Sequence, residues 1–285
     1  SAAVVTIERR VGSSDELDLN VESVIASYGL ATEFPPAALA QAEGIRAGVE
    51  EALKRESARR DLRSLRCMTI DPTDARDFDD AVYATQLPDG GFELWVHIAD
   101  VTHYVGWDTP IDNEAKRRTC SAYLVDRVLP MLPERLCNDV CSLRPREDRL
   151  AMSVRMELDA EGRLVSAEAM TSAIRSTARL DYDTVDALLA GRADASALHE
   201  NPEDAQALEG ALHALDRIRG LRERIREERG SIDFDTVEPK VTLDEEGHPT
   251  GVTVRTRTRA TGLVEEAMLL ANESVARMLA DRDVP

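Results

Sequence analysis

Five aspartates fall within the ten residues from Asp71 to Asp80, directly after the apolar run Cys67-Met68-Thr69-Ile70. Carboxylates held a few ångströms apart repel one another, so a desolvated group of them must take up protons or bind a cation. Mg²⁺ and Mn²⁺ prefer oxygen ligands and supply the missing charge. The spacing therefore indicates a catalytic metal site, with a solvated acidic turn as the alternative. A calcium-binding loop is excluded, because its glycine and distal glutamate are absent.

The elements beside this acidic stretch favour the metal site. Residues 68–70 predict one strand, and residues 81–86 and 92–99 predict two more, joined by the turn Leu-Pro-Asp-Gly-Gly. A loop fixed between strands is rigid enough to hold a metal geometry, unlike an acidic tail.

The rest of the chain predicts hairpins and helices. Hairpins are expected at residues 154–171 and 240–257, and helices at residues 19–29, 37–62, 182–189, 204–229 and 263–280. Strands and helices do not alternate along the chain, so the fold class is α+β.

Several sequence blocks stand in a recognisable order. They are Thr69-Ile-Asp-Pro, Asp74-Ala-Arg-Asp-Phe-Asp-Asp-Ala and Val96-His-Ile-Ala-Asp-Val, followed by blocks at residues 123–134, 136–144, 178–182, 229–234 and 263–272. Together they resemble the catalytic signature of the ribonuclease II and ribonuclease R (RNB) exoribonuclease family, from about residue 35 to the last residue.

This resemblance implies a domain organisation. Residues 64–285 would form an RNB-type catalytic domain, incomplete at its C-terminus, with a mixed, largely antiparallel sheet surrounded by helices. Residues 19–63 would be a helical lead-in, and residues 1–18 the end of a cold-shock (OB-fold) barrel.

The resemblance also implies an activity. Family members are metal-dependent 3′-to-5′ exoribonucleases that hydrolyse single-stranded RNA to nucleoside 5′-monophosphates. Two metal ions about 4 Å apart can activate water, neutralise the phosphate and stabilise the leaving oxygen. Four aspartates match the metal-binding positions, namely Asp71, Asp77, Asp79 and Asp80. The expected cofactor is Mg²⁺, with Mn²⁺ as the alternative, and Asp79 is the expected most sensitive ligand because it would also orient the attacking water.

Five further residues match family positions that contact RNA. Tyr123 would stack on bases at the cavity entrance, and Phe234 would clamp the 3′-terminal nucleotides. Tyr182 would lie beside the scissile phosphate. Glu265 or Glu266 would contact the ribose, where a 2′-hydroxyl distinguishes RNA from DNA. Adjacent helical residues face different directions, so only one of the two is expected to reach the cavity.

The overall charge opposes an RNA partner. The chain has 54 acidic and 35 basic residues and a formal charge of −19, whereas nucleic-acid binders usually show a basic surface. The acidic overall charge and the RNA partner implied by the resemblance are compatible if cationic side chains line a narrow channel. The cluster at Arg144 and the segment from Arg255 to Arg259 are the candidates for phosphate contact, and the run 217–229 is predicted to be a solvated helix.

The sequence predicts a cytoplasmic protein without a membrane partner. No run approaches the roughly 18 apolar residues of a membrane span, and no secretory signal is evident. The four cysteines lack the spacing of a zinc site or a disulfide framework, which fits a reducing compartment.

Two family features are absent from the matched blocks. The resemblance implies a further arginine-bearing segment that contacts the scissile phosphate, followed by an S1 RNA-binding barrel. An arginine directed at the phosphate contributes strongly to stabilising the transition state. We therefore expect a further chain or segment to supply this part. The alternative function is a catalytically incomplete RNA-binding or regulatory protein on the same scaffold.

Overall fold

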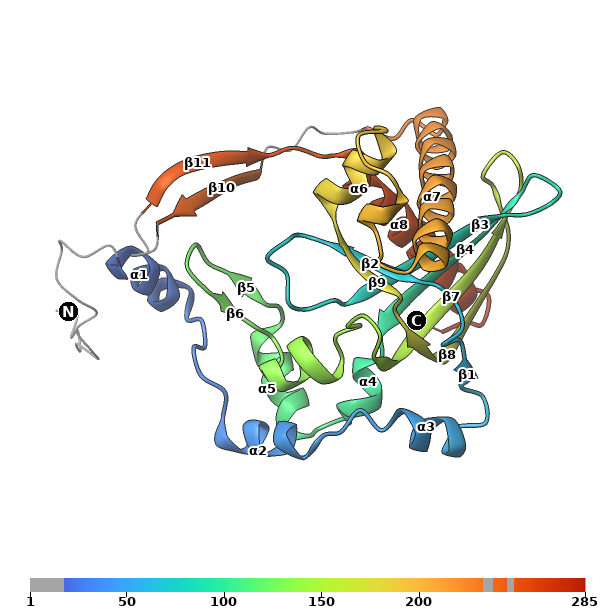
Figure 1. Cartoon of the computed structure of the whole chain (residues 1–285). Coiled ribbons are helices and arrows are strands. Elements are labelled where there is room, and N and C mark those ends of the chain that lie inside the picture. Colours follow the sequence, from blue (N-terminus) through green and yellow to red (C-terminus); the bar gives the residue numbers. More distant parts are fainter. Residues whose placement is uncertain (1–17, 233–237, 245–248, 285) are drawn as a thin grey trace, which may run out of the picture. The chain divides into compact units, whose positions relative to one another are not determined.

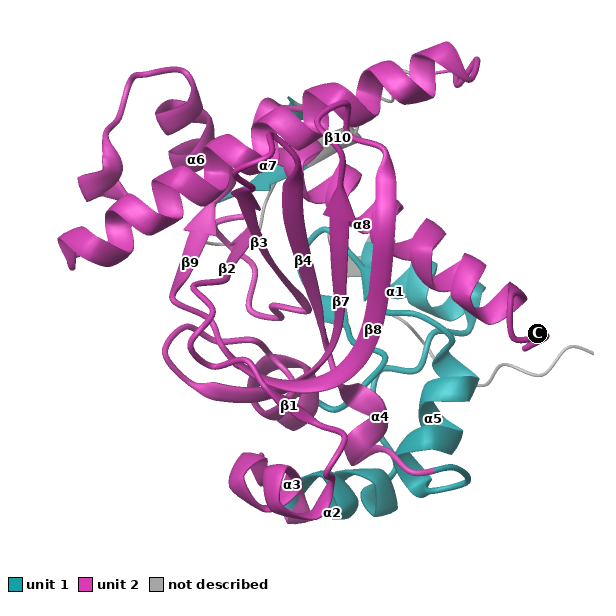
Figure 2. Ribbon diagram, turned by 90° about the vertical axis from the view of Figure 1, so that its right-hand side faces the viewer, with its two compact units in different colours: residues 1–43, 107–133, 236–256 teal, residues 44–106, 134–235, 257–285 magenta. Residues whose placement is uncertain are grey.

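The computed structural model describes residues 18–232, 238–244 and 249–284 (Figure 1). The chain divides into two compact units, which Figure 2 distinguishes by colour. The first unit contains residues 1–43, 107–133 and 236–256, and the second contains residues 44–106, 134–235 and 257–285. The acidic stretch belongs to the second unit.

A seven-stranded sheet forms the centre of the second unit, in the order β1-β8-β7-β4-β3-β2-β9. Its strands are β1 (Arg60–Asp61), β2 (Met68–Asp71), β3 (Asp80–Gln86), β4 (Phe92–Ala99), β7 (Asp148–Leu158), β8 (Leu164–Arg175) and β9 (Ala178–Asp181). The pairs β2–β3, β3–β4, β4–β7 and β7–β8 are antiparallel, whereas β1 runs parallel to β8 and β9 runs parallel to β2. The predicted α+β class with a mixed, largely antiparallel sheet is confirmed.

Three helices pack against one face of this sheet and enclose the main hydrophobic core. They are α6 (Tyr182–Leu189), α7 (Pro202–Glu228) and α8 (Arg259–Ala280). Alternate residues of a strand point to the same face, so Phe92, Leu94 and Val96 all enter the core, where each is fully buried. Leu208 of α7 and Leu270 of α8 belong to the same core. Shorter elements of this unit are α3 (Val49–Arg55), α4 (Val101–Tyr104), a π-helical turn at Leu136–Val140 and a 3-10 turn at Ala195–Ala197.

Helix α7 begins where Asn201 caps it. The Asn201 Oδ1 atom accepts hydrogen bonds from the backbone N–H groups of Glu203 and Asp204, at 2.9 and 3.4 Å. Replacing Asn201 with Ala should therefore lower the free energy of unfolding by about 1 kcal/mol, measured by urea denaturation. Asn201→Asp keeps an acceptor oxygen and should retain most of the stability. An equal loss in both variants would contradict the capping role.

The first unit contains short elements. They are α1 (Asp18–Tyr28), α2 (Pro36–Gly44), α5 (Pro110–Arg118), the hairpin of β5 (Ala122–Tyr123) with β6 (Val128–Leu129), and the hairpin of β10 (Glu238–Leu243) with β11 (Pro249–Arg255). In the described residues, no helix combines the length and the apolar character needed to cross a membrane.

The predicted long helix at residues 37–62 is wrong. The chain forms α2 and α3 instead, and then enters β1 at Arg60. Gly48, the N-cap residue of α3, has a φ of 56°, a left-handed conformation that glycine adopts without strain and that a continuous right-handed helix cannot contain. Residues 1–17, the expected end of a barrel, lie outside the described residues.

Candidate active site

The acidic stretch forms a loop between two neighbouring strands. Asp71 is the last residue of β2 and Asp80 the first of β3, and these strands pair antiparallel with Met68 opposite Val82. We call residues 71–80 the aspartate loop. Because adjacent antiparallel strands lie about 5 Å apart, this pairing brings the two ends of the loop together.

A parallel strand brings a distant segment to the same place. Strand β9 pairs with β2 so that Asp181 lies opposite Asp71. Helix α6 starts at the next residue, Tyr182, and the Asp181 side chain caps it by accepting a hydrogen bond from Thr184 N at 2.8 Å. Tyr182 therefore lies at the strand end that carries the aspartate loop, and its ring packs partly against the main core.

Burial and mutual repulsion raise the pKa values of three loop carboxyls. Asp71 is 9 % exposed, and burial, together with the charges of Asp77 and Asp79, raises its pKa to about 6. Burial and the charges of Asp71 and Asp79 raise the pKa of Asp80 to about 7. The Asp79 pKa is also raised, by desolvation and by Asp77, although its side chain keeps contact with solvent. The four aspartates thus share one electrostatic environment.

The donor chemistry of this loop fits a divalent cation. In the described part of the chain, Asp71 Oδ2 is buried without a hydrogen-bond partner of normal geometry, although Thr69 and Arg179 partly offset the effect of burial on the pKa of this carboxyl. Burying a carboxylate oxygen without a hydrogen-bond partner costs folding free energy. Such an oxygen is a preferred ligand for a hard cation. Among the described residues, no three His, Cys, Asp or Glu side chains lie close enough together to hold a metal ion, so the convergence of the four aspartates stays a prediction.

The raised pKa values make a prediction about stability without metal. The Asp80 carboxyl titrates near pH 7 in the folded protein, against an ordinary value of 3.8, so its ionised form destabilises the fold above pH 7. This penalty disappears as the pH falls from about 7 towards 4. In EDTA at pH 8, Asp80→Asn should therefore raise the free energy of unfolding by about 1 to 2 kcal/mol.

Urea denaturation of this variant at two pH values checks the sign. The gain should shrink at pH 4.5, where the wild-type carboxyl is protonated in the folded state. Asp74→Asn is the matched control, because Asp74 lies on the same loop with an exposed side chain, and it should change stability little at either pH. A loss of stability for Asp80→Asn at pH 8 would contradict the assigned repulsion.

Arg179 is a residue near the loop that was not predicted from the sequence. It lies on β9 opposite Thr69, and its Nη2 atom donates to the carbonyl oxygens of Pro72 and Thr73, at 2.6 and 2.8 Å. Its guanidinium lies 5.5 Å from the ring centroid of Phe78. Arg179 thus contacts both halves of the aspartate loop. In the sequence, a role for Arg179 at the site was indicated by its place in the family block at residues 178–182 and by nothing else.

The predicted RNA-contacting aromatics differ in their surroundings. Tyr123 lies on β5 of the first unit with 70 % of its surface exposed, as a base-stacking ring requires. Tyr182 lies beside the aspartate loop. Phe234 lies outside the described residues.

The two adjacent glutamates of α8 have different roles. Glu266 is 1 % exposed and forms an ion pair with Arg226 of α7, so it belongs to the packing between two helices. Burial raises the pKa of its carboxyl. The Glu265 side chain is 42 % exposed and pairs with Arg257 at 2.9 Å. Of the two, Glu265 is therefore the one that a ligand can reach.

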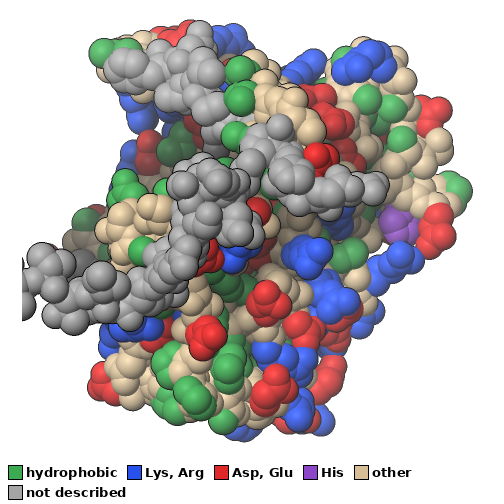
Figure 3. Space-filling view, turned by 90° about the vertical axis from the view of Figure 1, so that its left-hand side faces the viewer, with side chains coloured by type: hydrophobic (Ala, Val, Ile, Leu, Met, Phe, Trp, Pro, Cys, Tyr) green, Lys and Arg blue, Asp and Glu red, His purple; other side chains and the backbone are tan. Residues whose placement is uncertain are grey.

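Arg144, one of the arginines proposed for phosphate contact, already has acidic neighbours. Arg144 pairs with Asp139 and Glu147, each at 3.2 Å. On the face shown in Figure 3, acidic and basic side chains of the described residues are interspersed. The prediction of a solvated helix at residues 217–229 is wrong at Arg222, which is 4 % exposed and pairs with Glu273 of α8.

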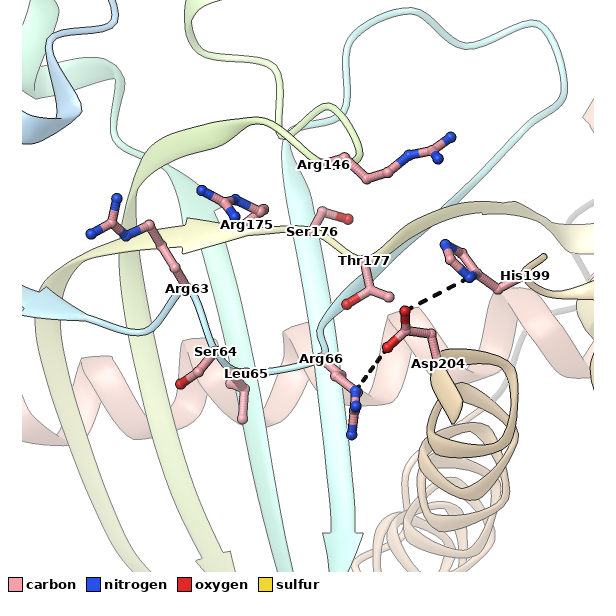
Figure 4. A pocket seen from close by; sticks show the side chains of 10 residues that line it. All are labelled: Arg63, Ser64, Leu65, Arg66, Arg146, Arg175, Ser176, Thr177, His199 and Asp204. Atoms are coloured by element: carbon pink, nitrogen blue, oxygen red, sulfur yellow. Dashed lines mark hydrogen bonds and ion pairs between the residues drawn. The ribbon is translucent and has the colours of Figure 1, made fainter. Parts of the chain in front are cut away.

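A pocket of about 260 Å³ opens at the other end of β2 and β9 (Figure 4). There Thr177 N donates to Cys67 O, before β2 begins, whereas the aspartate loop follows the end of β2. Four arginines line the pocket, and each has a carboxylate partner: Arg63 and Arg175 pair with Asp148, Arg66 with Asp204, and Arg146 with Glu200. The pocket is thus separate from the candidate active site.

Comparisons with known proteins find related sequences and folds. The model of the RNB domain family matches residues 59–285. Ribonuclease R 1 of Lactococcus lactis subsp. lactis is 42% identical over 276 residues, which are 96% of this chain and 33% of the relative. The chain therefore spans about a third of the length of this curated relative.

Two solved structures show the same fold. They are Mycoplasma genitalium RNase R in complex with ribose-methylated single-stranded RNA and the same protein with double-stranded RNA. Each matches with a TM-score of 0.88 and 31% identity over 96% of this chain, and over 41% and 47% of the respective solved chains.

Proposed function

This chain belongs to the RNB domain family, and from that premise we propose that it is the catalytic part of a metal-dependent 3′-to-5′ exoribonuclease. Its substrate would be single-stranded RNA, and its products nucleoside 5′-monophosphates. The observation that carries the proposal is the aspartate loop, where Asp71, Asp79 and Asp80 all have raised pKa values and Asp71 Oδ2 is buried without a hydrogen-bond partner of normal geometry in the described chain. The proposed catalytic domain is residues 64–285.

The loop aspartates would hold the cofactor. Asp71, Asp77, Asp79 and Asp80 would ligate Mg²⁺, or Mn²⁺ in its place, in a two-metal-ion site. When bound, these ions neutralise the phosphate and lower the pKa of the attacking water. Buried Asp71 and half-buried Asp80 must lose their protons before they can act as ligands, so cation binding should release protons near neutral pH. Asp79 is the solvent-exposed ligand, and its carboxylate oxygen would accept a hydrogen bond from the attacking water and orient it.

The substrate would be held without reading of its sequence. Tyr123, Tyr182 and Phe234 would stack on bases or pack beside the terminal nucleotides, a contact that every base can make. Glu265 would accept a hydrogen bond from the ribose 2′-hydroxyl, which DNA lacks. Because the four cysteines are free thiols, the proposal places this activity in a reducing compartment, the cytoplasm.

An end-labelling experiment tests this function. The protein is incubated with Mg²⁺ and single-stranded RNA labelled at the 3′ end or at the 5′ end, and with DNA of the same sequence. We expect the 3′ label to appear at once in mononucleotide and the RNA labelled at its 5′ end to shorten stepwise. EDTA should stop both reactions. The DNA should persist. Stable RNA binding without release of mononucleotides would instead support a regulatory RNA-binding protein. Internal RNA fragments would refute exonucleolytic cleavage.

A further inference from the structure

A serine from a distant segment holds the second half of the aspartate loop. The Ser142 Oγ atom accepts a hydrogen bond from Phe78 N at 3.0 Å and donates to Arg76 O at 3.3 Å. The next residue, Leu143, donates its backbone N–H to Phe78 O at 2.8 Å. Ser142 is fully buried, and it lies 64 residues from Phe78 in the chain. These contacts fix the backbone on both sides of Asp77 and immediately before Asp79.

The segment that carries Ser142 is itself anchored to the central sheet. It follows the π-helical turn at Leu136–Val140, a rare conformation that often occurs at functional sites. Arg149 of β7 donates from its Nε atom to Ser142 O at 2.9 Å, and Arg149 is 5 % exposed. The Ser142 carbonyl is therefore fixed to the sheet while its hydroxyl fixes the loop. The hydroxyl carries no charge, so it acts on the aspartates only through the backbone.

We propose that Ser142 is a positioning residue for the carboxylates of Asp77 and Asp79. The inference rests on the proposed function, which assigns these carboxylates to the metal site. Mutual repulsion opposes the convergence of these carboxylates, so a fixed attachment of the backbone lowers the cost of bringing them to one cation. An attachment that exists before the cation binds removes an ordering cost from binding, as outer hydrogen bonds do at metal sites.

Removal of the hydroxyl should loosen one half of the loop only. In Ser142→Ala the Phe78 N–H loses its buried acceptor, and the backbone from Arg76 to Asp80 must rearrange or become hydrated. Asp71 should stay in place, because Arg179 holds Pro72 and Thr73 independently. We expect the affinity for Mn²⁺ to fall about tenfold or more, as for other outer contacts at metal sites.

The decisive measurement is amide hydrogen exchange of the metal-free protein. Peptides that cover residues 76–80 should exchange about tenfold faster in Ser142→Ala than in the wild type, since losing a buried hydrogen bond favours local opening, while peptides of β4 stay unchanged. Ser172→Ala is the matched control, because Ser172 is also fully buried and its hydroxyl has two partners, Ala151 O at 3.2 Å and Ser153 Oγ at 2.6 Å. The control should lose stability without faster exchange of the loop or weaker Mn²⁺ binding.

The outcomes separate the inference from the proposed function. Unchanged loop exchange and unchanged Mn²⁺ affinity in Ser142→Ala would overturn the inference, whatever the activity. Faster exchange in a protein whose wild type neither binds Mn²⁺ nor cleaves RNA would support the attachment and refute the proposed function. Should Ser142→Ala not fold, Ser142→Cys provides the test, since a thiol is a weaker acceptor and should shift both readouts in the same direction by less.

Discussion

Replacing Asp79 with Asn is expected to slow mononucleotide release from single-stranded RNA by about 100- to 1,000-fold, the usual effect of losing one group that stabilises charge in the transition state. The substitution keeps the side-chain size but removes the negative charge that a cation and the attacking water require. The backbone should stay in place, because Asp79 O accepts a hydrogen bond from Ala99 N at 2.8 Å. The loss should therefore appear in kcat, with KM for RNA nearly unchanged.

Single-turnover kinetics with labelled RNA measure this effect. Asp74→Asn is the control on the same loop, and its rate should stay within about twofold of the wild type, since Asp74 has no assigned ligand role. A comparable loss in both variants would mean that the overall charge of the loop matters rather than the position of Asp79. Near wild-type release from Asp79→Asn would refute its assignment as a ligand.

Replacing Arg59 with Met is expected to lower the free energy of unfolding by about 3 to 5 kcal/mol, because it leaves a buried carboxylate without its counter-charge. Arg59 Nη2 lies 2.8 Å from Asp100 Oδ2, and the two side chains are 2 % and 4 % exposed. Arg59 also donates to Ser172 O of β8 at 2.9 Å. Asp100 in turn caps helix α4 at the end of β4. One substitution therefore disturbs several neighbouring elements.

Urea denaturation gives the size of this loss. Arg60→Met is the matched control, because Arg60 is the next residue and its ion pair with Glu168 lies at the surface, with side chains 65 % and 57 % exposed at 3.9 Å. Exposed pairs contribute little, so the control should change stability by less than about 1 kcal/mol. Equal losses would show that the burial of the Arg59–Asp100 pair does not determine its effect.

The strands at the centre of the fold were predictable because their signals are local. Alternating apolar residues at 92–99 and the turn before them indicated the β3–β4 hairpin, which the structure contains. The helix predicted at residues 37–62 was wrong because helix-forming composition extends through Gly48, whereas the left-handed backbone of Gly48 cannot lie inside a continuous helix. Composition measures an average propensity, and a single backbone conformation can override it.

The candidate site also has features that the sequence predicts and features that depend on the fold. The placement of the aspartate loop between two paired strands was predictable, because loop and strands are neighbours in the sequence, whereas the role of its aspartates as ligands stays a prediction. The contacts of Arg179 and Ser142 with the loop could not be predicted from sequence spacing. Arg179 lies 107 positions after Pro72, and Ser142 lies 64 positions after Phe78. The roles of Glu265 and Glu266 also could not be separated, since the direction that each side chain takes depends on where α7 packs.

The amino-acid sequence was enough to identify a group of carboxylates crowded into one loop, within a series of family blocks. The groups that surround this loop became visible in the folded chain alone. The parallel β2–β9 pair brings Tyr182 and Arg179 to it, and the segment after the π-helical turn brings Ser142. The two kinds of interaction differ in the sequence separation of their partners. Repulsion between neighbouring carboxylates follows from their covalent spacing, whereas burial and hydrogen bonding between distant segments exist only after the sheet has formed.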